Sequence, residues 1–200
     1  MHTFLVCYDY HESAKKLDRE HLGKQRVEAY QILNTIEDLY LVAQYFNYPL
    51  PMDNTLWKEW IRILVRSYLA LPIRFARNLQ TGEVYTCDTI AKSDSIYHYV
   101  TLTFPIYHPA VLMWLGHTES LKEYINAHIF EWMSRGYKNT MRTYEVQNAA
   151  RPLWSLDEKI YVNHRAALLK KEIERSKPAW FVHMPEFVVA GTFTEYIWPY

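Results

Sequence analysis

The sequence predicts a mainly α fold in one compact domain, and three observations support this. Apolar residues recur at helical intervals in several long stretches, which is typical of amphipathic helices. Half of the 200 residues are hydrophobic and only 5 are glycine, as expected of a chain that buries a substantial core. No internal repeat or low-complexity segment divides the chain.

The first long helix is expected to begin after a cap at Ser13 and to reach about Tyr45, with a break allowed within it. Pro49 and Pro51 follow and end the pattern. Residues 2–8 are rich in Thr, Phe, Val and Tyr, so a short extended segment is expected before the helix.

A second amphipathic helix is expected over Asp53–Leu71, and Ile73–Leu79 is expected to resume it after an interruption at Pro72. Residues 83–103 mix Tyr, Thr, Val and Ile with polar residues in no clear period. We therefore expect loop or short strand in this stretch.

A third helix is expected over Ala110–Arg135, with a bend at Gly116 and a left-handed cap at Gly136. A last helix is expected over Leu156–Ser176, before an aromatic-rich tail over Pro178–Tyr200. Helices packed around aromatic contacts are therefore the predicted architecture.

The charge balance limits the partners that the chain can bind. Its 22 basic and 22 acidic residues give a net charge of zero, so nucleic-acid binding requires a local basic patch. Lys58–Arg77 holds five cations against Glu59 alone, and Arg165–Lys177 holds five against Glu172 and Glu174. By default, the first of these is a solvated helix face.

Several classes of protein are disfavoured by the absence of their sequence signatures. Cys7 and Cys87 lack metal-type spacing and suggest no disulfide framework, which fits a reducing compartment. The nine histidines form no HExxH motif, and there is no glycine-rich phosphate loop or GxSxG elbow. With no leader-like start and no apolar run of membrane length, we expect a cytoplasmic protein without a metal or cofactor.

The stretch Leu17–Leu33 concentrates polar side chains on a predicted helix. His21, Gln25 and Glu28 follow the spacing i, i+4, i+7, which places them on nearly one side of the helix. Arg19 and Arg26 form a second stripe beside them. On an arbitrary helix this pattern is more often a surface salt-bridge face, so a functional interpretation needs support from the rest of the chain.

That support comes from three stretches which, in this order, resemble the endonuclease V-type family of pyrimidine dimer DNA glycosylases. In the first, His21-Leu22 followed by Glu28 resembles the family's helix with its catalytic glutamate. The others are HPAVLMWLGH to EWMSRGYKNT, over residues 108–140, and NHRAALLKK with SKPAWF and YIWP, over residues 163–199. The resemblance implies a compact helical glycosylase domain over residues 1–200, with residues 47–104 as an inserted segment.

The resemblance also implies an activity. The family excises ultraviolet photoproducts from DNA and then nicks the abasic site, with the main-chain amine at the N-terminus as nucleophile. The amine attacks C1′ and displaces the base, which leaves an imine between protein and sugar, and the strand then breaks by β-elimination. By this resemblance Met1 and Glu28 are the expected catalytic residues, and no cofactor is required.

The sequence departs from the phage members of the family at two positions. Phage members lose the initiator methionine before a small second residue, whereas His2 is too bulky for ordinary methionine removal, so Met1 is the expected nucleophile here. Val27 stands where the phage enzymes have a DNA-contacting arginine. Neighbouring cations are expected to substitute for it, and a basic residue beside Trp180 suits a nucleic-acid backbone with an adjacent base. The expected DNA contacts are His2, Arg19, His21, Lys24, Gln25, Arg26, His164, Arg165, Lys170, Lys171, Lys177 and Trp180.

The expected partner is double-stranded DNA with damaged bases or abasic sites, bound by a monomer. Two alternatives remain open. One is a DNA-binding relative that keeps the fold and has lost the chemistry, which the neutral charge, Val27 and the retained methionine favour. The other is a glycosylase for a different base lesion, because the inserted segment could reshape the pocket.

Overall fold

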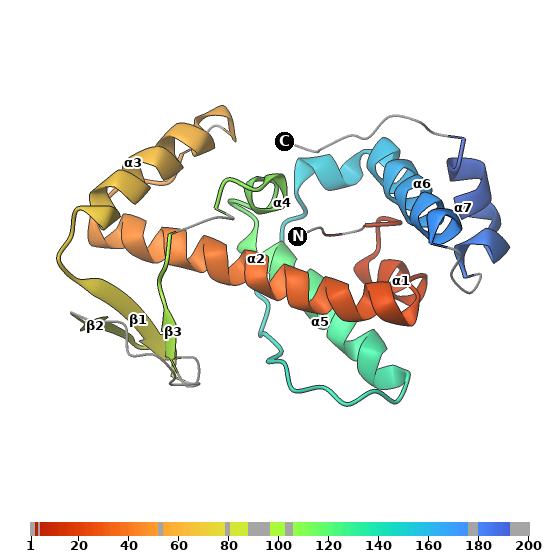
Figure 1. The fold of residues 1–200 in the computed structure, drawn as a ribbon, viewed down its shortest axis with the longest axis horizontal. Coiled ribbons are helices and arrows are strands. Elements are labelled where there is room, and N and C mark those ends of the chain that lie inside the picture. Colours follow the sequence, from red (N-terminus) through yellow and green to blue (C-terminus); the bar gives the residue numbers. More distant parts are fainter. Residues whose placement is uncertain are drawn as a thin grey trace.

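The computed structural model describes residues 3, 5–51, 54–78, 81–87, 97–102, 106–175 and 180–192. Within these residues the fold is mainly α, as predicted, with seven α-helices and one small antiparallel sheet. In Figure 1 the long helix α2 crosses the middle of the molecule, with α3 and the sheet at one end and α6 and α7 at the other. The helices are α1 Tyr10–Lys15, α2 Arg19–Tyr45, α3 Trp57–Leu69, α4 Pro109–Leu112, α5 Thr118–Ser134, α6 Glu158–Glu174 and α7 Pro185–Ala190, and the 3₁₀ helices are Asn54–Leu56, Leu153–Leu156 and Phe181–His183.

The predicted first helix is two helices, each capped by an aspartate. The Asp9 side chain accepts the backbone N–H of Glu12 at 2.9 Å, and the Asp18 side chain accepts that of His21 at 2.7 Å. The prediction that Ser13 caps the helix was wrong. Ser13 is buried inside α1, where its hydroxyl accepts the N–H of Val6 at 2.9 Å.

The predicted helix over residues 110–135 is also divided, at the expected glycine. Helix α4 ends at Leu112, and the turn after it leads to Gly116, whose left-handed φ of +79° lets the chain enter α5. The N–H of Gly116 donates to the Tyr40 hydroxyl at 2.7 Å, which fixes this turn against α2. Gly136, with φ +82°, follows the last turn of α5 as predicted.

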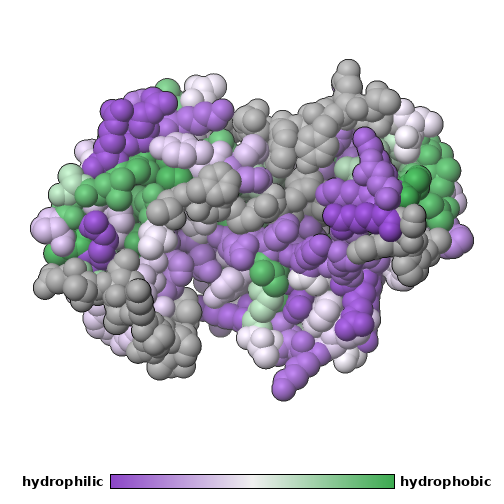
Figure 2. Space-filling model, in the orientation of Figure 1, coloured by the Kyte–Doolittle hydropathy of each residue, from purple (hydrophilic) through white to green (hydrophobic). Residues whose placement is uncertain are grey.

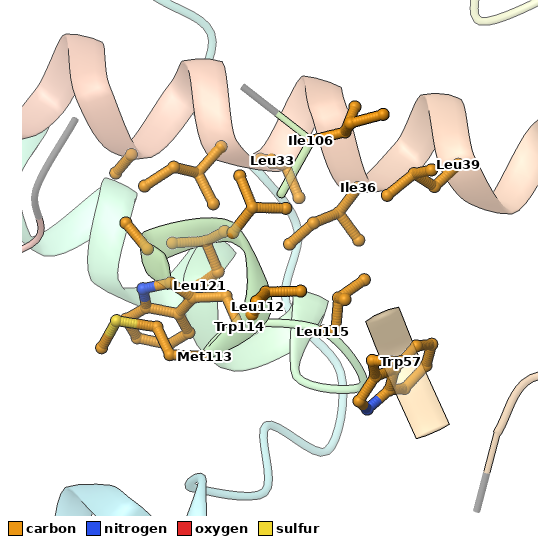
Figure 3. Close-up of a cluster of buried hydrophobic side chains, with 14 of the residues drawn as sticks. Leu33, Ile36, Leu39, Trp57, Ile106, Leu112, Met113, Trp114, Leu115 and Leu121 are labelled. Carbon is orange, nitrogen blue, oxygen red and sulfur yellow. The ribbon is translucent and has the colours of Figure 1, made fainter. Parts of the chain in front are cut away.

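The main hydrophobic core lies between α2, α3, α5 and the turn that contains α4. Figure 3 shows Leu33 and Ile36 of α2 facing Leu112 and Trp114, and all four side chains are buried. The Trp114 indole N–H donates to the Thr3 hydroxyl at 2.9 Å, so the N-terminal segment is attached to this core.

A three-stranded antiparallel sheet replaces the helix expected over residues 73–79. Strands β1 Arg74–Asn78, β2 Val84–Cys87 and β3 Tyr97–Tyr99 have the order β2-β1-β3, with Phe75 opposite Thr86 and Ala76 opposite Tyr99. Pro72 removes a helical donor ahead of β1. The Tyr68 hydroxyl then ties the sheet to α3, because it accepts the N–H of Phe75 and donates to the carbonyl of Val100.

The last part of the chain forms a second core around α6. The predicted helix over residues 156–176 is confirmed as α6, which begins after an Asp157 cap. The buried Glu172 carboxylate accepts the backbone N–H groups of Trp180, Phe181 and Val182 at 2.6–3.1 Å. This carboxylate therefore fixes the return of the chain that leads to α7.

The N-terminal segment passes beside α6. The N–H of Leu5 donates to His164 Nδ1 at 2.8 Å, and Arg165 Nε donates to the carbonyl of Val6 at 2.7 Å. Thr3, Leu5 and Val6 belong to no strand, so the extended segment expected over residues 2–8 is not a sheet strand at these positions. Within the described residues, no helix combines the length and hydropathy that crossing a membrane requires.

The buried His164 makes stability depend on pH. Burial lowers its pKa from 6.5 to about 4, so the unfolded chain binds a proton that the folded protein excludes. Stability is therefore lost as the pH falls below 6.5 toward 4, by an amount on the order of 2 kcal/mol between pH 7.5 and 5. In His164→Asn, whose side-chain oxygen can still accept the N–H of Leu5, this part of the loss should disappear.

Urea unfolding of both proteins at pH 7.5 and pH 5 measures this difference. Burial also lowers the pKa of His128 to about 4, so a residual pH dependence is expected in the variant. The assignment to His164 fails if both proteins lose the same free energy of unfolding between the two pH values.

Candidate active site

An open groove of about 660 Å³ follows the N-terminal half of α2 and reaches the end of α5. Its lining combines two cations, two carboxylates, an amide and apolar groups. Figure 2 shows a largely hydrophilic surface across the middle of the molecule, with a small hydrophobic patch within it. The groove residues are Arg19, Glu20, Gly23, Lys24, Val27, Glu28, Gln31 and Trp132.

At the Trp132 end of the groove, aromatic rings and guanidinium groups pack against one another. The Arg26 guanidinium lies 4.0 Å from the Trp132 ring centroid, Tyr137 lies on the same indole at 4.4 Å, and Arg19 lies 4.9 Å from the Tyr137 ring. A Cβ at Gly23 would approach Trp132 Cζ3 to 3.2 Å, so the glycine gives the indole its place against α2.

Glu28 lies at the side of the groove where α2, α4 and α6 meet. It is partly exposed, and its charge acts on His108, at the N-terminus of α4, and on Lys171 of α6. Burial lowers the pKa of His108, and the Glu28 carboxylate opposes that shift. Because His108 Nδ1 accepts the N–H of Ala110 at 3.1 Å, the neutral ring carries its proton on Nε2.

Cations gather around this carboxylate. Burial lowers the pKa of Lys171, Arg175 and Lys24 lower it further, and Glu28 opposes them. Lys24 Nζ lies 2.8 Å from Glu20 Oε1, and Arg175 Nη1 lies 3.7 Å from the same oxygen. The groove therefore has a positively charged border, although its lining alone is balanced.

A family model described as pyrimidine dimer DNA glycosylase matches residues 1–145. The chain belongs to this family. The match covers the first two of the three stretches that resemble the family, and the third lies beyond it. No curated protein and no solved structure matches the chain.

In this glycosylase-family chain, two residues predicted to lie beside Glu28 face the core. His21 is buried, its Nδ1 lies 2.9 Å from both Asp18 carboxylate oxygens, and its ring meets Phe181 edge to face. Gln25 is buried and its Oε1 accepts the Tyr124 hydroxyl at 2.8 Å. Both residues therefore make contacts within the protein that hold α2 in place.

Arg26 is also engaged within the protein. Besides its stacking on Trp132, its Nη1 donates to Asn139 Oδ1 at 2.9 Å, and only 8% of the residue is exposed. Arg19 and Lys24, in contrast, are exposed and line the groove. The structure thus separates the three cations into one structural group and two that DNA can reach.

The predicted contacts in the C-terminal part have different environments. His164 is buried against the N-terminal segment, where it accepts the N–H of Leu5. Arg165 is partly exposed and holds Val6, whereas Lys170 is exposed with Glu174 at 3.8 Å. The Trp180 indole N–H donates to the carbonyl of Lys16. Trp180 itself is 38% exposed.

Met1, His2 and Lys177 lie outside the described residues. The first described residue, Thr3, is 1% exposed and held by Trp114, and Leu5 is held by His164. The N-terminal segment therefore has fixed contacts on α6 and next to α4.

The basic group over Lys58–Arg77 does not form one face. Lys58, Arg62 and Arg66 are on α3, and Arg62 pairs with Glu59 there. Arg74 and Arg77 belong to β1 because the chain leaves the helix before them. The prediction that the helix resumes after Pro72 had placed all five cations on one helix face, and it was wrong for Arg74 and Arg77.

Sequence reasoning missed two members of the site, His108 and Trp132. Both residues lie in the second stretch that resembles the family, over residues 108–140, and no site role was predicted for either. The His-Pro pair at a predicted helix start is a capping signal that could have located His108. Trp132 has no such signal, since its half-buried position depends on Gly23 and Arg26 from another helix. Among the described residues, no group of three or more His, Cys, Asp or Glu is arranged to hold a metal ion.

Replacing Arg26 with methionine should lower the free energy of unfolding by about 1–3 kcal/mol, because the variant loses the stacking on Trp132 and the hydrogen bond to Asn139. The matched change Lys24→Met removes an exposed cation two residues before Arg26 and should change stability by about 0.5 kcal/mol or less. Urea unfolding of the two variants at one pH compares them directly. Equal losses in both would contradict the structural role given to Arg26.

Proposed function

We propose that this protein is a DNA glycosylase with abasic-site lyase activity on ultraviolet pyrimidine dimers. Met1 supplies the nucleophilic amine, and Glu28 is the catalytic carboxylate. The observation that carries the proposal is the position of Glu28, at the edge of an open groove and in electrostatic contact with His108 and Lys171. Membership of the family adds the substrate class, DNA with pyrimidine dimers.

The proposed chemistry uses the main-chain amine because it titrates far below a lysine. An α-amine has a pKa of about 8, so a useful fraction is unprotonated at neutral pH. The amine attacks C1′ of the damaged nucleotide, and the bond from C1′ to the base breaks as the base leaves. The sugar ring then opens, because the C1′–O4′ bond breaks and O4′ takes a proton, which leaves an imine between protein and sugar. The imine acidifies the neighbouring sugar proton, whose removal expels the 3′ phosphate by β-elimination.

Glu28 has two roles in this proposal. Its carboxylate stabilises positive charge that develops on the sugar as the base leaves, and it transfers protons between the reacting groups. The partly exposed position of Glu28 suits both roles, because DNA can reach it while α2 holds it rigidly.

His108 is proposed to act beside Glu28 in its neutral form. Burial lowers its pKa, so the ring adds no positive charge next to the amine at neutral pH. Its Nδ1 accepts the N–H of Ala110, so the neutral ring donates through Nε2–H. This ring would orient the carboxylate and the substrate without competing for the proton of the amine.

The cations on the border of the groove are the proposed phosphate contacts. Arg19 and Lys24 are exposed on α2, and Lys171 is on α6 next to Glu28. Lys170 and Arg165, also on α6, and the 38% exposed Trp180 are further proposed contacts. His2 and Lys177 remain proposed contacts from the sequence alone.

Val27 is compatible with this arrangement. It lines the groove and is 45% exposed, so an apolar side chain occupies the position at which phage enzymes place an arginine. Arg19 and Lys24 line the same groove, and both precede Val27 on α2. We propose that these two cations replace the missing arginine as phosphate contacts, and that Val27 packs against the sugar edge.

Borohydride reduction should trap a covalent complex between the protein and DNA that contains an abasic site or a pyrimidine dimer, because it reduces the imine to a stable amine. Denaturing gels detect the complex. Acetylation of the N-terminal amine should abolish trapping, and trapping that survives acetylation would remove Met1 from the mechanism. Duplex binding without any trapping or nicking would instead identify a DNA-binding relative without the chemistry.

Glu28→Gln should lower the rates of base excision and strand nicking by about 100-fold or more, since general acid–base groups contribute this much. Glu20→Gln is the matched control, because Glu20 lines the same groove on the same helix. Single-turnover rates on dimer-containing and abasic duplexes measure both variants. Full activity of Glu28→Gln would exclude the carboxylate from catalysis.

A further inference from the structure

A second, polar pocket of about 210 Å³ lies where the sheet meets α2 and α5. This volume is several times the roughly 30 Å³ that one water molecule occupies in the liquid, so a tetrahedral phosphate group fits. Arg77 comes from β1, Lys122 from α5 and Arg142 from the segment after α5. Asn34 and Glu37 of α2 also line the pocket, as does Tyr144.

The three cations of the pocket differ in whether carboxylates of the protein already pair with them. Arg77 pairs with Glu37, lies 3.8 Å from Asp38 and donates to Asn34 at 3.3 Å. Lys122 Nζ gives one of its three donors to Glu119 at 2.6 Å. Two cations are thus held in place by carboxylates.

Arg142 provides the positive charge that an anion would meet. It is exposed, its guanidinium lies 5.3 Å from the Tyr144 ring centroid, and no carboxylate among the described residues pairs with it. Guanidinium groups bind phosphate through two parallel hydrogen bonds. Arg142 and the free donors of Lys122 therefore form a two-sided site for a phosphate group.

The backbone that carries Arg142 is fixed in position. The Asn126 side chain binds Tyr144 twice, since its Nδ2 donates to the carbonyl at 2.7 Å and its Oδ1 accepts the N–H at 2.9 Å. On the other side, Asn139 Nδ2 donates to the carbonyl of Met141 at 2.8 Å. Two asparagines on α5 and after it thus hold the segment on either side of Arg142.

The pocket lies in line with the groove along α2. Arg19, Gly23 and Val27 of the groove and Tyr30, Asn34 and Glu37 of the pocket are spaced by three or four residues, which places them on one stripe of the helix. From Lys24 to Asn34 the helix rises about 15 Å, which corresponds to roughly four base pairs of duplex. Figure 1 shows the strands below the C-terminal part of α2 and the segment after α5 below its middle.

We propose that this pocket binds a phosphate of the DNA backbone a few base pairs away from the nucleotide at Glu28. The residues expected to form an inserted segment, 47–104, supply Arg77, so the segment has a function as one wall of this phosphate site. The proposal rests on the proposed function, since it extends the contact of the same protein with the same duplex.

The test compares two variants that each lose two positive charges. Lys122→Gln/Arg142→Gln changes the pocket, and Lys15→Gln/Arg62→Gln changes two exposed cations that are paired with Glu12 and Glu59 far from it in sequence. The Kd for undamaged duplex DNA is measured over a range of salt concentrations. Loss of one phosphate contact should lower the slope of log Kd against log salt by about 1 in the pocket variant, with the wild-type slope kept in the control.

A thermal melt of each variant checks the fold. If the double pocket variant melts below the wild type, the single exposed change Arg142→Gln replaces it, with the same expected direction. Equal slopes in wild type and pocket variant overturn the proposal. Stabilisation of the wild type by inorganic phosphate at constant ionic strength, absent in the pocket variant and without any change in the DNA slope, also overturns it, because the pocket would then hold free phosphate.

The result is separable from the test of the proposed function. One outcome is that the wild type gives no borohydride-trapped complex while the pocket variant has a lower slope of log Kd against log salt. That result would support the phosphate site and contradict the enzymatic proposal. The opposite outcome is that the wild type is trapped on abasic DNA while the pocket variant binds like the control. That result would support the enzymatic proposal and contradict the phosphate site.

Discussion

The burial of one stripe of α2 is the constraint on which the rest of the structure depends. Leu22, Ala29, Ile32, Leu33 and Ile36 are fully buried against α4, α5 and α6. Each large apolar side chain removed from water contributes about 1.5–3 kcal/mol, so this stripe fixes the rotation of the helix. Once the rotation is fixed, the opposite stripe must face solvent, and it is this stripe that carries the groove, Glu28 at its edge and the polar pocket.

The break between α4 and α5 has a comparable consequence for the site. An unbroken helix over residues 110–135 would carry its N-terminus away from α2. The left-handed Gly116 instead turns the chain back, and its N–H is held by Tyr40 of α2. The capping His108 is thereby brought within electrostatic reach of Glu28. Gly116, eight residues after His108, therefore affects the surroundings of the Glu28 carboxylate.

The sequence was sufficient to predict the elements that depend on local periodicity. It was insufficient for elements whose structure depends on contacts with residues distant in the chain. The apolar repeats correctly predicted the positions of α2, α3, α5 and α6. The strand at Arg74 could not be predicted in this way, since it depends on Tyr68, β2 and β3. In the candidate site, periodicity placed His21, Gln25 and Glu28 on one side of a helix. Spacing could not say where the core ends on that side, and the boundary falls between Gln25 and Glu28.

The neutral net charge of the chain is compatible with binding a polyanion because electrostatic attraction at physiological salt is local. The Debye length is about 8 Å, so charges on the far side of the protein contribute little at the groove. Within that range the border of the groove has Arg19, Lys24, Lys171 and Arg175 against Glu20 and Glu28. Farther along the same stripe of α2 lies the polar pocket. There the exposed Arg142, from the segment after α5, adds a cation that pairs with no carboxylate among the described residues. A duplex lying along α2 would thus meet positive charge at two places, with the Glu28 carboxylate between them, which is the arrangement that the proposed phosphate contacts and the proposed role of Glu28 require.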